Sequence, residues 1–181
     1  VKTLHAVFLG KDGSGDNKMN IYYASKTASG AWTAPVLISR NNWNQDAKDF
    51  PSIKVDANNK AHVVYAHKNG SSDNKINIYY TTNLSGTWST PVRISSDAFN
   101  SDAFTPEIAL DAAGKAYVVY QHQSSTDSKR SIYYVTNASG SWSAPARLSN
   151  NAFNNDAGLN PAIAADVTGK AHVVFRHKAT T

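Results

Sequence analysis

The sequence predicts an all-β protein built from β-propeller blades, and two repeated patterns carry this prediction. The motif Ser-Gly-x-Trp-[Ser/Thr]-x-Pro occurs three times, and its tryptophans, Trp32, Trp88 and Trp142, are 56 and 54 residues apart. A second repeat consists of prolines at steps of 55 residues: Pro51, Pro106 and Pro161. Self-similarity at a fixed period of this length indicates stacked supersecondary units, none of which can bury its apolar face alone.

The second copy of the repeat shows what one unit contains. Four short segments rich in β-branched and aromatic residues are separated by turn-forming residues: Pro51–Asp56, Ala61–His67, Ile76–Thr82 and Thr87–Ser95. The turn at residues 83–86 holds Asn and Gly, which tolerate the positive φ that a hairpin needs. Four antiparallel strands per repeat form the blade of a propeller. A β-sandwich would not explain the regular spacing.

We label the strands of a blade A to D from the hub outwards, and expect about three blades in a single propeller fragment of residues 1–181. The expected units are a partial blade of strands B, C and D in 1–40, blades in 51–95 and 106–149, and a partial blade of strands A and B in 161–181. Closed propellers have about four to eight blades. The chain is therefore either cut from a longer repeat protein or completed by a second copy.

In the second case we expect a homodimeric ring of about six blades. The terminal A strand of one chain would join the opening B, C and D strands of the other, so that no bare strand edge is left. One B strand of each chain is then surplus.

Composition bears on the class of function. The chain has no cysteine, so it has neither disulfides nor thiol chemistry. Its net charge of +5 comes from scattered lysines and not from a basic run, which argues against nucleic-acid binding. No apolar run approaches the ~20 residues of a membrane span. Only 17% of the residues are charged, and the many Asn, Ser and Thr suit a secreted or cell-surface protein.

The candidate binding residues recur once per repeat. The expected D–A loops carry an aromatic-Asn-x-Asp-Ala motif and the expected B–C loops carry a histidine, and in this topology both loops emerge on one face, where binding loops belong. The candidates are Trp43, Asn44, Asp46, His67, Phe99, Asn100, Asp102, His122, Phe153, Asn154, Asp156 and His177. An aromatic face with a carboxylate and an amide suits a sugar, and repetition would add avidity.

A structural interpretation of the same residues stays open. An Asp or Asn in a loop commonly bonds nearby backbone amides, and the aromatic side chain could fill the gap between blades. Other repeated residues are expected to be structural: the tryptophans as blade packing and Asp56, Asp111 and Asp166 as closure of the A–B turns. At the start of strand B, Tyr117 takes the place of the histidine that the other copies have, such as His62, and this argues against a metal at that position.

Several motifs resemble those of a known family. They are Ile-Tyr-Tyr, Ser-Gly-x-Trp-[Ser/Thr]-x-Pro, Pro-x-Ile-x-x-Asp and [His/Tyr]-Val-Val-[Tyr/Phe], and together they are similar to bacterial relatives of the sialidase and BNR (Asp-box) propellers. The resemblance covers essentially the whole chain and implies a propeller fold. The Asp-box itself is incomplete, because Gly86 lies two residues before Trp88 instead of three and its turn holds no Asp.

The resemblance also implies a catalytic set that this chain does not match. Sialidases use three converging arginines, a Tyr–Glu nucleophile pair and an Asp acid. Here Glu107 is the only glutamate, and three of the five arginines occupy one repeated position at the end of strand D: Arg40, Arg93 and Arg147. Ordinary glycoside hydrolysis needs at least paired carboxylates.

The sequence therefore predicts a non-catalytic, multivalent, lectin-like propeller with no cofactor and no metal among its site residues, and leaves a role for Ca²⁺ open. The alternative is a structural or protein-binding propeller module, or a fragment of one, that has no sugar ligand.

Overall fold

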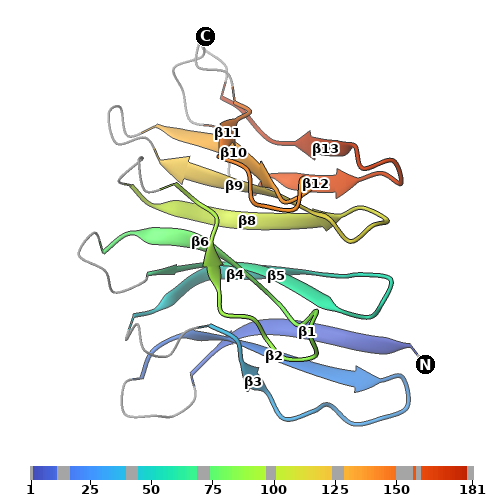
Figure 1. Cartoon of the computed structure of the whole chain (residues 1–181). Coiled ribbons are helices and arrows are strands. Elements are labelled where there is room, and N and C mark those ends of the chain that lie inside the picture. The colour runs from blue at the N-terminus through green and yellow to red at the C-terminus, as the bar shows by residue number, and fades with distance from the viewer. Residues whose placement is uncertain are drawn as a thin grey trace.

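The computed structural model of the chain describes residues 2–11, 17–39, 45–68, 74–96, 101–123, 129–149, 157 and 160–178, without the side chains of residues 49 and 50. Within these ranges, thirteen strands form four antiparallel sheets, and no helix is present that could cross a membrane. Figure 1 shows the four sheets stacked in chain order, from β1–β3 at the bottom to β12–β13 at the top.

Along the chain, the strands form a sheet of three, two sheets of four and a sheet of two. The first sheet holds β1 (Thr3–Gly10), β2 (Asn20–Thr27) and β3 (Val36–Leu37). The second holds β4 (Ala47–Val55), β5 (Ala61–Lys68), β6 (Ile76–Thr82) and β7 (Val92–Arg93). The third holds β8 (Ala103–Leu110), β9 (Ala116–Gln123), β10 (Arg130–Thr136) and β11 (Ala146–Arg147). The last holds β12 (Ala162–Ala165) and β13 (Ala171–Val174). Each strand pairs with its chain neighbour, which is the topology of a propeller blade.

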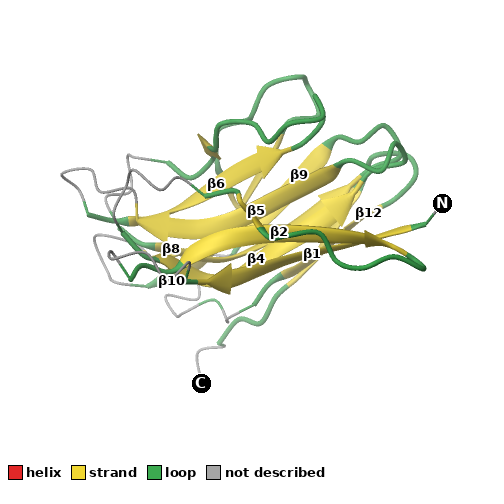
Figure 2. Cartoon of the chain, turned by 90° about the horizontal axis from the view of Figure 1, so that it is seen from below, coloured by secondary structure: helices red, strands yellow, loops and turns green. Residues whose placement is uncertain are grey.

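The outermost strands are much shorter than the others. Strands β3, β7 and β11 have two residues each and begin directly after Pro35, Pro91 and Pro145. Proline cannot donate a hydrogen bond to a ladder, so pairing starts only after it. A short outer strand also offers little free edge to other chains. Figure 2 shows that the long strands of successive sheets run in similar directions, so their ends gather at two opposite ends of the stack.

The A strands begin earlier than the sequence predicts. Strand β4 begins at Ala47 instead of Pro51, and its pairing with β5 shifts register between Lys48 and Ser52. Strand β8 likewise begins at Ala103, with a shift between Phe104 and Glu107. The proline lies inside the irregular stretch in both strands, where a bulge removes the need for its missing N–H.

The closing hairpin is short and lies within residues 161–181, where the sequence predicts strands A and B. Strand A spans Ala162–Ala165, and strand B ends at Val174. His177 forms an isolated antiparallel bridge with Ala157.

The apolar core lies between the sheets. In β5, Val63 and Tyr65 belong to the cluster shared with the first sheet, which includes Ile21 of β2. The alternate residue Val64 belongs to the cluster shared with the third sheet, which includes Val118 of β9. Successive side chains of a strand point to opposite faces. A central blade therefore buries both of its faces, but only when a blade stands on each side.

An aromatic pair joins each blade to the one before it. Trp88 of the second blade packs edge-on against Tyr23 of the first, with ring centroids 4.9 Å apart. Trp142 packs in the same way against Tyr80 at 5.0 Å. The predicted role of the tryptophans in blade packing is confirmed at these two positions. Trp32 lies in the first blade of the stack, between β2 and β3, and is 48% exposed.

We expect Trp88→Ala to lower the free energy of unfolding by about 2 kcal/mol, because it removes a half-buried aromatic contact between two blades. Guanidinium denaturation followed by tyrosine fluorescence would measure the loss. Leu84→Ala, in the exposed turn of the same blade, is the control and should change little. Equal effects of the two substitutions would contradict the role of Trp88.

Candidate functional site

The sheet pairing brings the Asp-Ala pairs and the histidines together at one end of the stack. Ala47 pairs with His67, and Ala103 pairs with His122. Asp46 and Asp102 directly precede these alanines, so each Asp stands beside the histidine of its own blade. The bridge between Ala157 and His177 repeats the arrangement in the last sheet. The Asp and His signals, which are far apart in the sequence, thus meet in the second and third blades.

The carboxylates of Asp46 and Asp102 connect neighbouring blades. Oδ1 of Asp46 accepts a hydrogen bond from the backbone N–H of Met19 in the first blade, at 3.0 Å. Oδ1 of Asp102 accepts one from the N–H of Ile76 in the second blade, at 2.8 Å. The bond from Met19 is the main reason that the pKa of Asp46 is lowered, and Lys48, with its Nζ 3.5 Å from Oδ2, contributes. These oxygens therefore have a structural task whether or not they also meet a ligand.

The histidines lie in the wall of the site and not on its surface. His67 and His122 are 0% and 2% exposed. Nδ1 of His67 donates to the carbonyl oxygen of its neighbour Lys68, and Nδ1 of His122 donates to that of Gln123 at 2.9 Å. Burial lowers the pKa of both imidazoles, which favours their neutral form. His177 is less buried, and its Nδ1 donates to the carbonyl oxygen of Lys178 at 3.1 Å.

The remaining candidates lie outside the described residues. They are the aromatic and Asn residues of the three D–A motifs and the last Asp: Trp43, Asn44, Phe99, Asn100, Phe153, Asn154 and Asp156. The described part of the chain contains no group of three or more His, Asp or Glu side chains that could hold a metal ion.

The opposite end of the stack is formed by tight A–B turns, as predicted. Oδ1 of Asp56 accepts hydrogen bonds from the backbone N–H groups of Asn58 and Lys60, at 2.9 and 2.8 Å. Asp111 and Asp166 close their turns through the same pair of positions. The predicted turn closure is therefore confirmed in all three copies.

A buried series of polar contacts behind this turn was not predicted from the sequence. Nδ1 of His62 lies 2.7 Å from the hydroxyl of Tyr80, and its Nε2 lies 3.9 Å from Oδ2 of Asp56. His5 and Tyr23 repeat the His–Tyr contact at 2.7 Å in the first blade. A His at the start of strand B occurs together with the second Tyr of Ile-Tyr-Tyr in both repeats. This recurrence could have predicted the His–Tyr contact.

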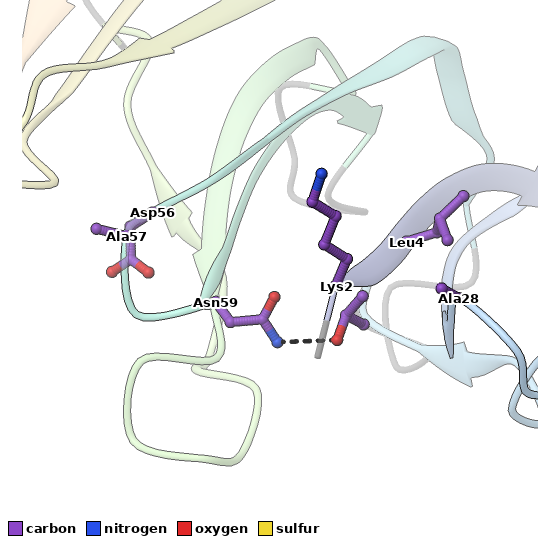
Figure 3. Close-up of a pocket in the computed structure, with 7 residues that line it drawn as sticks. Lys2, Leu4, Ala28, Asp56, Ala57 and Asn59 are labelled. Atoms are coloured by element: carbon purple, nitrogen blue, oxygen red, sulfur yellow. Dashed lines mark hydrogen bonds between the residues drawn. The ribbon is translucent and has the colours of Figure 1, made fainter.

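A cavity of about 560 Å³ opens beside this turn, between the first two blades (Figure 3). Its lining is Lys2, Thr3, Leu4, Ala28, Asp56, Ala57 and Asn59. The amide of Asn59 donates to Oγ1 of Thr3 at 3.4 Å, and its Oδ1 accepts from Nε2 of His5 at 3.0 Å. The amide thus joins two blades, and the cavity is a seam between them.

Three solved structures are similar to the chain in fold. A PL25 ulvan lyase bound to -[GlcA(1-4)Rha3S]- has a TM-score of 0.65 at 9% identity, over 96% of this chain and 48% of that one. The GH93 α-L-arabinofuranosidase of Fusarium graminearum in complex with arabinobiose has 0.61 at 14%, over 90% and 49%. The endo-arabinase from Bacteroides thetaiotaomicron has 0.53 at 16%, over 99% and 71%.

These likenesses decide the fold. The chain is a partial β-propeller of about three blades. It spans about half the length of the first two structures. The similar structures are carbohydrate-related propellers and do not indicate the sialidase and BNR family specifically. At the level of sequence, no protein-family model and no curated protein matches the chain.

We expect Asp102→Ala to lower the free energy of unfolding of this propeller by about 1–3 kcal/mol, because it leaves the Ile76 amide without its acceptor. Asp102→Asn keeps an oxygen at that position and should lose less. Guanidinium denaturation would measure both, with Ser85→Ala in an exposed turn as the control. Stability that is the same in all three variants would contradict the bond between blades.

Because three histidines are buried, we expect the protein to lose stability in mild acid. Burial lowers the pKa of His62, His67 and His122 below the ordinary histidine value of about 6.5. The unfolded chain then binds more protons, so their contribution is complete above about pH 6.5 and is lost as the pH falls towards the folded pKa values. Each histidine can contribute a slope of at most about 1.4 kcal/mol per pH unit.

Urea unfolding between about pH 7.5 and about pH 5.5 would measure this slope. His62→Gln should reduce it, whereas the control Ser85→Ala, in an exposed turn, should leave it unchanged. A stability that does not change over this range would refute the expectation. The contribution of Asp46, whose pKa is also lowered, is lost only at lower pH, below the ordinary aspartate pKa of about 3.9.

Proposed function

We propose that this chain is a non-catalytic, multivalent carbohydrate-binding propeller, and that a second copy completes its ring. The observation that carries the sugar site is the repeated pairing of Asp-Ala with a buried His at one end of successive blades. In each repeat the Asp follows two residues after an Asn that is itself preceded by an aromatic residue.

The chemistry of each repeat suits a sugar. A flat aromatic ring such as Trp43 or Phe99 can stack on the C–H face of a pyranose, and the neighbouring Asn44 or Asn100 amide can bond its hydroxyls. We assign sugar contact to these loop residues and, in the last repeat, to Phe153 and Asn154. Asp46, Asp102, His67 and His122 are positioning residues, because their bonds fix the base of the loops.

The bonding of the described carboxylates supports binding and not hydrolysis. Those of Asp46, Asp56, Asp102, Asp111 and Asp166 each accept backbone N–H groups. Oε2 of Glu107 accepts from the hydroxyl of Ser52 at 2.8 Å. Glycoside hydrolysis needs two carboxyl groups that face the scissile bond. The similar solved structures act on carbohydrates, and this chain's proposed role keeps their ligand class without their chemistry.

The alternative function is a structural or protein-binding propeller module without a sugar ligand. It is favoured by the same hydrogen bonds, because a bond from Asp46 or Asp102 to the preceding blade is enough to explain the recurrence of that Asp. The two functions differ in what they require of the aromatic residue in each loop.

A glycan array, read with and without Ca²⁺, tests the proposal. We expect selective binding, and a loss of at least about tenfold in apparent affinity for Trp43→Ala and for Phe99→Ala because multivalent sites act together. Leu84→Ala, 51% exposed at the opposite end of the stack, is the matched control. Folded protein that binds no glycan would favour the alternative. Asp→Ala variants are unsuitable, because they also disturb the contact between blades.

A further inference from the structure

The first sheet presents an apolar face that its counterparts in the other blades bury. Val7 and Leu9 of β1 pack towards the second sheet, so Leu4 and Phe8 point to the other side. Leu4 and Phe8 are 47% and 38% exposed, whereas the equivalent Ala61 and Tyr65 of β5 are both 0% exposed. Trp32 lies between β2 and β3 of the same blade and is 48% exposed. We call the face of Leu4, Phe8 and Trp32 the opening face.

The last sheets in chain order carry an aromatic side chain, Tyr134, whose counterparts in the earlier blades are covered. Tyr23 and Tyr80 are 8% and 7% exposed beneath Trp88 and Trp142. Tyr134 of β10 is their equivalent and is only half buried. The final hairpin covers its neighbour incompletely, since β12 and β13 alternate between partly buried and exposed residues. We call the side of the third and fourth sheets around Tyr134 the closing face.

We propose that a second copy of this chain seats its opening face on the closing face of the first, with Trp32 of one copy packed edge-on against Tyr134 of the other. The inference deepens the ring completion proposed above and rests on it. The Trp88–Tyr23 and Trp142–Tyr80 pairs show that such faces fit. Because each chain carries both halves of the contact, two copies related by a twofold axis satisfy both junctions.

The strands of two copies then make a closed ring. Each copy supplies two complete blades, and at each junction β12 of one copy provides the A strand for β1, β2 and β3 of the other. The ring has six blades, within the usual range of about four to eight. The β1 edge left without an A strand is paired in this arrangement.

Strands β1 and β13 compete for one place in the junction blade, because both are B strands. Strand β1 pairs with β2 along all eight of its residues, whereas β13 pairs with β12 along four. Strand β1 therefore keeps its place and β13 leaves. In the single chain, Phe175 packs with Val173 against the third blade. In the assembled ring, the side chain of Phe8 takes the place of Phe175.

The polar groups at the junction match as well. His5 contacts Tyr23 as His62 contacts Tyr80, but among the described residues of its own blade no Asp stands beside it as Asp56 stands beside His62. Asp166 directly follows the incoming A strand β12, and in the single chain its Oδ2 is 3.3 Å from Nε2 of His172. In the ring, Asp166 exchanges His172 for His5 of the second copy.

Native mass spectrometry and light scattering of the full chain test the assembly without any sugar present. The expected mass is twice that of one chain. A monomer at all concentrations would overturn the proposal, and so would a series of growing oligomers, because these mean an open arc. A monomer that binds glycans would refute the ring alone, and a dimer that binds none would refute the sugar site alone.

Substitutions at the junction test the contact itself. Trp32→Ala should raise the dimer dissociation constant at least about tenfold, as expected for a central tryptophan. Leu84→Ala, which removes an equally exposed side chain outside the junction, should change it less than about twofold. Both variants should keep the wild-type circular dichroism, because both side chains are exposed in the single chain. Equal effects on the dimer would overturn the assignment.

Cysteine cross-linking tests the register, since the chain has no cysteine of its own. A mixture of Trp32→Cys and Tyr134→Cys variants, bridged by a short bis-maleimide, should give mixed dimers. Neither variant alone should cross-link. Cross-linking of Trp32→Cys with itself, or a dimer without mixed products, would overturn the register.

Val173→Lys tests the fate of β13. The lysine weakens the packing of β13 on the third blade, which exists only in the single chain, so the dissociation constant should fall at least about threefold. If β13 stays in the junction blade, the dissociation constant rises instead, and the proposed exchange of strands is wrong.

Discussion

Packing between blades is the constraint on which the rest of this structure depends. A blade of four short strands has two apolar faces and little interior of its own, so it is stable only where other blades cover it. Tyr65 and Tyr120 are fully buried because a sheet lies on each side of theirs, whereas Phe8 at the same position of the first sheet is 38% exposed. Burial in this chain is decided by neighbours and not by residue type.

Three contacts join the first two blades at different points along the strands. At the loop end, Asp46 binds the backbone of Met19, and at the turn end Asn59 binds Thr3 and His5. Between them, Trp88 packs on Tyr23. The polar contacts fix the angle between blades at both ends, because each satisfies a group that would otherwise lose a hydrogen bond on burial. The aromatic contact supplies apolar area.

The same arrangement explains why a binding site would form at the loop end. Asp46 and His67 meet there because the pairing of β4 with β5 sets Ala47 opposite His67. Their hydrogen bonds hold the two ends of the adjoining loops, so a ligand would meet a base that is already ordered. The tight A–B turns at the other end use their Asp side chains for their own amides and have little left to offer a ligand.

The sequence by itself determined the strands, their order and the turns. Asp56, Asp111 and Asp166 close their turns as predicted, because a turn is formed by residues two to four positions apart whose types specify it. Only the tertiary structure decided that β4 begins at Ala47, that His67 is buried and that Asp46 binds Met19, 27 residues away in another blade. These outcomes depend on which backbone groups face each other across two sheets. The repeat predicts that blades stack, but their register and angle are set by the packing of all side chains between them.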